Sequence, residues 1–127
     1  MKSLNKVQSH LIAECFNKLY IGGQFVDAID GEKIPTYYPA TGELLHEFPR
    51  GKANDVDAAI AAAEAAWVEG TWAGMSATER AEIVTKMAQG IEDNIEILAE
   101  IEAADVGKPY RQAAMTLGGA AGEGKYW

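Results

Sequence analysis

The chain has 127 residues, enough for one domain or for part of one. Its formal net charge of −8 and its lack of any basic run argue against binding to nucleic acid or to an anionic membrane surface, because both need clustered Lys and Arg. The single cysteine, Cys15, excludes an internal disulfide and fits a reducing compartment, so we expect a cytoplasmic protein. No apolar stretch approaches membrane-spanning length, and the first residues do not resemble a secretory signal.

The first part of the chain is predicted to be an arm followed by short strands. Residues 1–18 show weak helical patterning and are expected to form an N-terminal arm. Four strands are then predicted, over about 19–21, 24–27, 33–38 and 43–48. Gly22-Gly23 and Asp30-Gly31 are typical of the tight turns that join such strands.

From Asn54 onward the pattern becomes helical. Asn54 or Asp55 is predicted to cap a first helix. One face of that helix is apolar and consists of Val56, Ile60, Ala63 and Trp67. Gly70 and Gly74 then bracket a loop.

The strongest helical signals lie between Ser76 and Pro109. Ser76 and Glu79 form a capping box, in which the hydroxyl and the carboxylate each satisfy a free backbone N–H. The helix that follows has an apolar face that includes Ile83, Met87 and Ile91.

Asp93 and Glu96 repeat the capping spacing, so a second helix start is predicted there. Gly107 is expected to end this helix in the left-handed conformation, because Pro109 prevents its continuation. Pro109 is in turn expected to begin a last helix that runs to about Leu117, since the glycines of GGAAGEGKYW make a longer helix costly.

Together these elements predict an α+β or α/β fold, with short N-terminal strands followed by three to four amphipathic helices. The apolar faces need more surface to cover them than the short strands supply. The chain also ends on the aromatic pair Tyr126-Trp127, which we interpret as a sign that it is incomplete.

The sequence contains no convincing catalytic set. Residues 119–125 spell G-x-x-x-x-G-K, but a phosphate-binding loop needs a preceding strand and a Ser or Thr where Tyr126 stands. Cys15 has no local nucleophile signature, and His10 and His46 are too isolated to indicate a zinc site. The clustered carboxylates of the helices are typical of solvated faces. They are Glu92, Asp93, Glu96, Glu100 and Glu102.

Asp105 is the exception among the acidic residues. It is predicted to lie at a helix end, where the helix dipole disfavours a carboxylate. A cation or a backbone donor could offset that cost, and a structural hydrogen bond is the favoured alternative to an ion ligand.

Five segments carry motifs whose order and spacing are informative. They are LYIGGQFVDA, PTYYPATGELL, DVDAAIAAAEAAW, the W-x-x-M-S-x-x-E-R stretch from Trp72 to Arg80, and EIEAADVGKPYRQA, with KYW at the end. In succession they resemble the N-terminal part of the aldehyde dehydrogenase superfamily, including its N-P-A-T-G-E turn and its D-x-G-K-P signature. The resemblance runs from about Leu19 to the last residue.

The resemblance implies an NAD(P)-dependent oxidoreductase that converts aldehydes to carboxylic acids. In the family, a cysteine thiolate attacks the aldehyde, hydride passes to the nicotinamide, and a Glu-activated water releases the acid. The residues for these steps, the oxyanion Asn and the nucleotide-binding motif all lie later in family chains. No catalytic or cofactor-binding residue is therefore assigned here. Cys15 is not assigned as the nucleophile, because it precedes the first family strand.

One site can be carried over from the resemblance. Some family members hold a monovalent cation with backbone carbonyls of the P-T-x-N-P strand and with the Asp of D-x-G-K-P. The matching positions are Thr36, Tyr37 and Asp105. The sequence departs from the pattern at Tyr38, which stands where the family usually has Asn.

Two hypotheses about function follow. In the first, the chain is the N-terminal portion of an aldehyde dehydrogenase, is inactive alone, and binds neither aldehyde nor NAD or NADP without the rest of the fold. In the second, it is a stand-alone, non-enzymatic module that associates with itself or with a partner and thereby covers its apolar faces.

Overall fold

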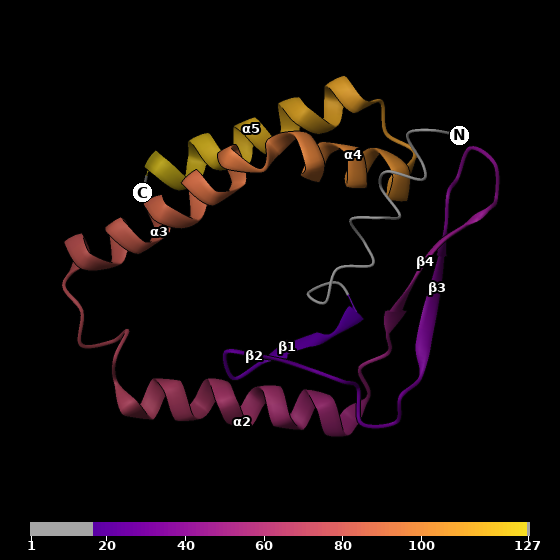
Figure 1. The fold of residues 1–127 in the computed structure, drawn as a ribbon. Helices are drawn as coiled ribbons and strands as arrows, with labels where there is room; N and C mark the ends of the chain where they lie inside the picture. Colours follow the sequence, from indigo (N-terminus) through magenta and orange to yellow (C-terminus); the bar gives the residue numbers. More distant parts are fainter. Residues whose placement is uncertain (1–16, 127) are drawn as a thin grey trace. The chain divides into compact units, whose positions relative to one another are not determined.

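The computed structural model describes residues 17–126. The elements in chain order are β1 (Leu19–Ile21), β2 (Gln24–Val26), β3 (Lys33–Tyr37), β4 (Leu44–Pro49), α2 (Ala53–Glu69), α3 (Ala77–Asp93), α4 (Ile95–Val106) and α5 (Tyr110–Tyr126) (Figure 1). The observed order of short strands followed by helices confirms the predicted fold class. Except for its last two residues, the predicted arm lies outside the described residues.

The chain divides into two compact units. The first contains residues 17–37 and 43–73, and the second contains residues 38–42 and 74–126. The strands and α2 thus belong to the first unit, and α3, α4 and α5 to the second.

The first unit contains two antiparallel hairpins. β1 pairs with β2 across Gly22-Gly23, and β3 pairs with β4. Both turn glycines have positive φ, 59° and 77°, as the primed turns of short hairpins require. In the second hairpin, Leu45 is buried and supplies part of the small core of this unit. The four predicted strands are therefore confirmed, with ends shifted by no more than one residue.

α2 starts two or three residues earlier than a cap at Asn54 or Asp55 would allow. The N-cap residue is Lys52, and Asp55 lies at the third helical position. The predicted position of the N-cap was wrong, but Asp55 does supply the capping carboxylate, which reaches backward along the chain and accepts the Lys52 backbone N–H at 2.9 Å. The helix ends at Gly70, whose φ of 75° is left-handed.

α3 begins as the sequence predicts. The Glu79 backbone N–H donates to the Ser76 hydroxyl at 3.3 Å, and the Ser76 backbone N–H donates to the Glu79 carboxylate at 2.7 Å. Both halves of the capping box are therefore present. The predicted apolar face also includes Ala88, which is buried, whereas Met87 on the same face is 68% exposed.

The predicted second capping box does not form. Asp93 is the last residue of α3, and α4 starts after Asn94 without a side-chain cap bond. The Asn94 side chain instead donates to the Gly90 carbonyl at 2.9 Å, so it closes α3 rather than opening α4. At its other end, α4 stops at Gly107 with φ 71°, as predicted.

α5 is the largest departure from the sequence prediction. It begins after Pro109 but does not stop near Leu117, and it runs through four glycines to Tyr126. Figure 1 shows α5 beside both α3 and α4, and this contact explains the extension. A Cβ added at Gly124 would lie 3.1 Å from the Cβ of Ala88 in α3, so this glycine permits a close approach of the two helices.

The contact between these three helices is built from small side chains. The buried residues along it are Ala88, Ala99, Ala104, Ala113 and Ala121. We call this set the alanine seam. Packing along the seam compensates for the low helix propensity of glycine, which costs about 1 kcal/mol per residue relative to alanine.

The glycines of α5 provide a direct test of this account. Gly119→Ala and Gly122→Ala should each raise the free energy of unfolding by about 0.5–1 kcal/mol, because open space surrounds both positions and alanine is the better helix former. Gly124→Ala should bring no such gain, because its methyl group would press on Ala88. Urea unfolding of the three variants checks this, and an equal gain at all three positions would contradict the packing argument.

Candidate functional site

The predicted cation-binding residues of the strand region lie in the first unit. Thr36 is in β3, opposite His46 of β4, and the pairing register shifts between Thr36 and Tyr37. Such an irregularity turns backbone groups out of the regular ladder, which is what a carbonyl ligand needs. The side chain of Tyr37 is exposed.

Asp105 lies in the second unit, in the last turn of α4, and is exposed. The turn formed by residues 38–42 belongs to the same unit and packs against the end of α4. A Cβ added at Gly107 would lie 3.3 Å from the Cβ of Pro39, so glycine is required there by space as well as by its positive φ. The turn itself is closed by the Gly42 N–H, which donates to the Tyr38 carbonyl at 2.8 Å.

Pro39 and Gly107, which follow the predicted ligands in the sequence, lie together in the second unit, whereas Thr36 and Tyr37 belong to the first. Binding of the ion by Thr36, Tyr37 and Asp105 stays a prediction. Within residues 17–126, no three His, Cys, Asp or Glu side chains are grouped so that they could hold a metal ion.

The G-x-x-x-x-G-K sequence does not form a phosphate-binding loop. Residues 119–125 lie inside α5, and Lys125 donates to Glu92 at 2.5 Å and to Gln89 at 3.1 Å. Lys108 similarly binds Glu102 at 2.7 Å. The Lys125–Glu92 contact therefore joins α5 to α3. The Lys108–Glu102 contact lies beside the turn between α4 and α5.

Three further residues were considered from the sequence, Cys15, His10 and His46. Cys15 and His10 lie outside the described residues. His46 is half-buried in β4 with its ring 4.9 Å from that of Phe48. Burial lowers the pKa of His46, and the nearby Lys33 lowers it further.

The sequence indicated Asp55 as a candidate cap of the first helix but did not reveal its second contact. It is 4% exposed, and its two carboxylate oxygens accept backbone N–H groups from Lys52 and from Ile29, each at 2.9 Å. The first bond caps α2, and the second holds the segment after β2 against the helix. The sequence predicts the capping contact in part, whereas nothing in it indicates the bond to Ile29, which is 26 residues away.

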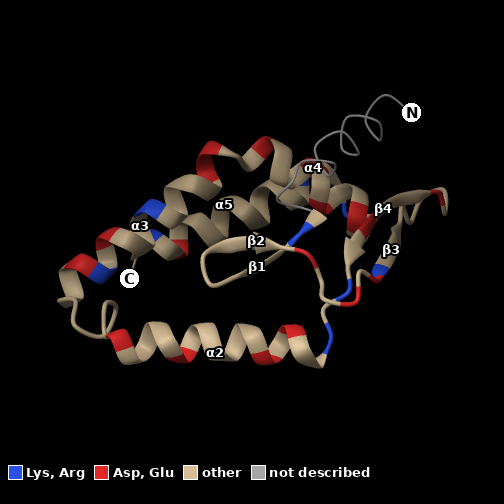
Figure 2. Cartoon of the chain, turned by 60° about the horizontal axis from the view of Figure 1, so that its bottom comes forward, with Lys and Arg blue, Asp and Glu red and all other residues tan. Residues whose placement is uncertain are grey.

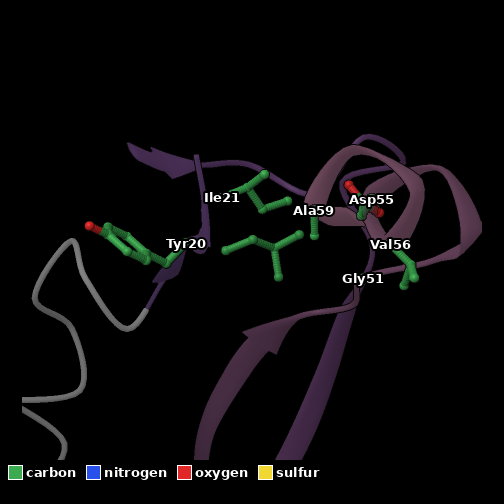
Figure 3. A pocket seen from close by; sticks show the side chains of 7 residues that line it. Tyr20, Ile21, Gly51, Asp55, Val56 and Ala59 are labelled. Carbon is green, nitrogen blue, oxygen red and sulfur yellow. The ribbon is translucent and has the colours of Figure 1, made fainter. Parts of the chain in front are cut away.

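An open recess of about 230 Å³ lies beside Asp55, between β1 and α2. Its lining is mainly apolar and includes Leu19, Ile21, Val56 and Ala59. In Figure 3, Ile21 and Ala59 lie on facing sides of this recess, whereas the ring of Tyr20 points away from them. The recess offers apolar contact and no set of reactive groups.

The pKa of Asp55 is lowered by the hydrogen bonds from the Lys52 and Ile29 N–H groups, whereas desolvation opposes this change. A carboxyl whose pKa is lower in the folded state stabilises that state above its ordinary pKa. The contribution is lost as the pH falls through the folded-state value.

Asp55→Asn should therefore lower the urea midpoint of unfolding at pH 7, and the difference from the unchanged chain should shrink as the pH falls toward about 3. Asp57→Asn is the matched control, because Asp57 lies in the same helix but is exposed. Equal effects of the two substitutions, or an Asp55→Asn effect independent of pH, would show that the double N–H contact does not matter.

None of the helices in residues 17–126 combines the length and the apolar character needed to cross a membrane.

Comparison with known proteins gives consistent matches. The sequence model described as "Aldehyde dehydrogenase family" matches residues 25–127. The mitochondrial benzaldehyde dehydrogenase of Antirrhinum majus is 43% identical over 99 residues, covering 78% of this chain and 18% of that protein. The chain thus spans about a fifth of the length of the curated relatives it matches.

Solved structures agree with the sequence matches. The NAD-dependent aldehyde dehydrogenase of Sinorhizobium meliloti has a TM-score of 0.83 at 37% identity, over 86% of this chain and 22% of that one. The betaine aldehyde dehydrogenase of Staphylococcus aureus, solved with NAD+, has a TM-score of 0.92 at 23% identity, over 99% of this chain and 25% of that one. At 23% identity, the match to the betaine aldehyde dehydrogenase shows a shared fold and nothing more.

Proposed function

The chain belongs to the aldehyde dehydrogenase family, and from this premise we propose that it is the N-terminal portion of an NAD(P)-dependent enzyme that oxidises an aldehyde to a carboxylic acid. Its own role in that enzyme is structural. It supplies two hairpins and four helices against which the remaining polypeptide packs. The catalytic thiol, the water-activating acid and the nucleotide site belong to that remaining polypeptide.

The observation that carries this proposal is the extent of the match. Residues 25–127 correspond to the family, while the chain covers only 18% of the benzaldehyde dehydrogenase and 22% of the Sinorhizobium meliloti enzyme. Two ion pairs of the second unit fit a structural role, since Lys125 joins α5 to Glu92 of α3 and Lys108 joins the α4–α5 turn to Glu102 of α4.

NAD is the cofactor that we propose for the whole enzyme, because the Sinorhizobium meliloti relative is named NAD-dependent. A cytoplasmic location is proposed from the lone cysteine. The cation ligands Thr36, Tyr37 and Asp105 are retained in this proposal as residues of the complete fold.

The alternative function is a stand-alone module for self-association or partner binding. It is favoured by the exposed apolar side chains of α2, among them Ile60 and Trp67. The two proposals differ in whether these residues are covered by further dehydrogenase polypeptide or by a separate molecule.

A chimera tests the main proposal. In the Sinorhizobium meliloti enzyme, residues 25–127 of this chain would replace the equivalent segment. We expect the chimera to be soluble and to form NADH from aldehyde and NAD+, whereas the purified 127-residue chain should form none. The assay follows NADH absorbance with a panel of aldehydes.

Two outcomes would contradict the proposal. An insoluble or inactive chimera would mean that the segment does not fit the dehydrogenase fold and would favour the stand-alone module. NADH formation by the purified chain, lost in a Cys15→Ala variant, would show that the chain carries its own reactive thiol.

A further inference from the structure

The turn between β2 and β3 contains the single Asp-Gly pair of the sequence, Asp30-Gly31. The Gly31 backbone N–H closes this turn by donating to the Ala28 carbonyl at 2.9 Å, so Asp30 is the third of its four residues. Both Asp30 and Gly31 are exposed. An aspartate that precedes glycine in an exposed turn can react with the next backbone nitrogen.

The reaction needs only the chain and water. The Gly31 nitrogen attacks Cγ of Asp30, a C–N bond forms, the nitrogen loses its proton, and one carboxyl oxygen leaves as water. Water then opens the resulting succinimide ring at the main-chain carbonyl of Asp30. The backbone now continues through Cγ, and the former main-chain carbonyl has become a carboxylate. One water leaves and one is added, so the product, isoaspartate, has an unchanged mass.

The surroundings of Gly31 leave room for this ring. Glycine has no side chain to crowd the attacking nitrogen. A Cβ added at Gly31 would meet nothing within 4 Å, so no neighbouring group blocks the ring either. The steric conditions for ring closure are therefore met.

Contacts on both sides of the turn oppose ring closure. Before Asp30, the Ile29 N–H donates to the Asp55 carboxylate at 2.9 Å. After it, the Glu32 carbonyl accepts the Arg50 N–H at 2.8 Å. Because Asp30 lies between these two anchors, its backbone can rotate toward the ring geometry only when the turn opens.

The Asp30 carboxylate is itself held by an ion pair. Its Oδ2 lies 3.0 Å from Nζ of Lys52, which also pairs with Glu32. Figure 2 shows acidic and basic residues next to one another where the strands meet the start of α2. Cγ of Asp30 can approach the Gly31 nitrogen only after the pair with Lys52 breaks. An exposed pair of this kind is weak, so it slows the reaction without preventing it.

We propose that Asp30 is a site of isoaspartate formation in the folded chain, and that its ion pair with Lys52 restrains the reaction. The product has one more backbone carbon between residues 30 and 31, so the bonds at Ile29 and Glu32 no longer fit the same turn. Modification of this one residue thus loosens the first unit at the start of α2.

Incubation of the purified 127-residue chain at neutral pH tests the site. Trypsin then releases residues 19–33, which contain both Asp27 and Asp30. The isoaspartyl peptide should have an unchanged mass, elute separately and resist the endoproteinase that cleaves before aspartate at position 30. Cleavage before Asp27 is the internal control, because the methyl group of Ala28 hinders ring closure there.

Two substitutions test the restraint. Lys52→Gln should raise the rate of isoaspartate formation at Asp30 in the folded chain by up to about fivefold, the effect of losing an exposed ion pair. Arg50→Gln is the matched control, since it removes the same charge but Arg50 pairs with Glu32 and not with Asp30. In urea the unchanged chain and both variants should react equally fast, and circular dichroism checks that each is folded without urea.

Added salt gives a second measurement that needs no substitution. It should raise the rate in the folded, unchanged chain and have little effect in Lys52→Gln, because salt screens the pair. Absence of isoaspartate in folded Lys52→Gln, over a time in which the chain in urea converts, would overturn the site. Equal rates for folded Lys52→Gln and Arg50→Gln, or a rate in the unchanged chain that salt leaves constant, would overturn the restraint.

Discussion

The close approach of α5 to α3 and α4 is the constraint on which the second unit depends. The alanine seam lets three helices pack with little side-chain volume between them, and Gly124 faces Ala88 where even a methyl group would press on its neighbour. Small side chains bury little area each, so the stability comes from extensive backbone proximity and dispersion contacts. Ion pairs such as Lys125–Glu92 lie at the margin of this packing and add modestly to it.

The first unit is organised around a polar contact instead. The Asp55 carboxylate satisfies one N–H at the start of α2 and another in the segment after β2. A nearly buried carboxylate is stable there because both of its oxygens are hydrogen-bonded. One side chain thus fixes the helix start and the strand region together, and it leaves the opposite side of α2 available.

These two units explain why the chain fits a role as scaffold. Ion pairs such as Arg50–Glu32 and Lys108–Glu102 connect helices or loops, and the glycines with positive φ end helices or close turns.

The sequence by itself determined the elements whose signals are local. Ser76 with Glu79 gave the start of α3, Gly107 gave the end of α4, and Gly22-Gly23 gave the first hairpin, because each depends on atoms within a few residues. The resemblance to the aldehyde dehydrogenase family could also be recognised from the sequence, since five of its motifs occur in order. Thr36 and Tyr37 were named as candidate cation ligands from that resemblance alone, whereas Asp105 was also indicated by its place at a helix end.

Tertiary structure decided the rest. The length of α5 depended on packing against α3, which outweighs the low propensity of its glycines and which no local pattern contains. The exposure of Met87 beside buried Ala88 depended on which side of α3 meets α5. Asp55 became a double acceptor only because the fold brings Ile29, 26 residues away in the sequence, to its carboxylate. Sequence spacing records neighbours along the chain, whereas these features arise between residues that only folding brings together.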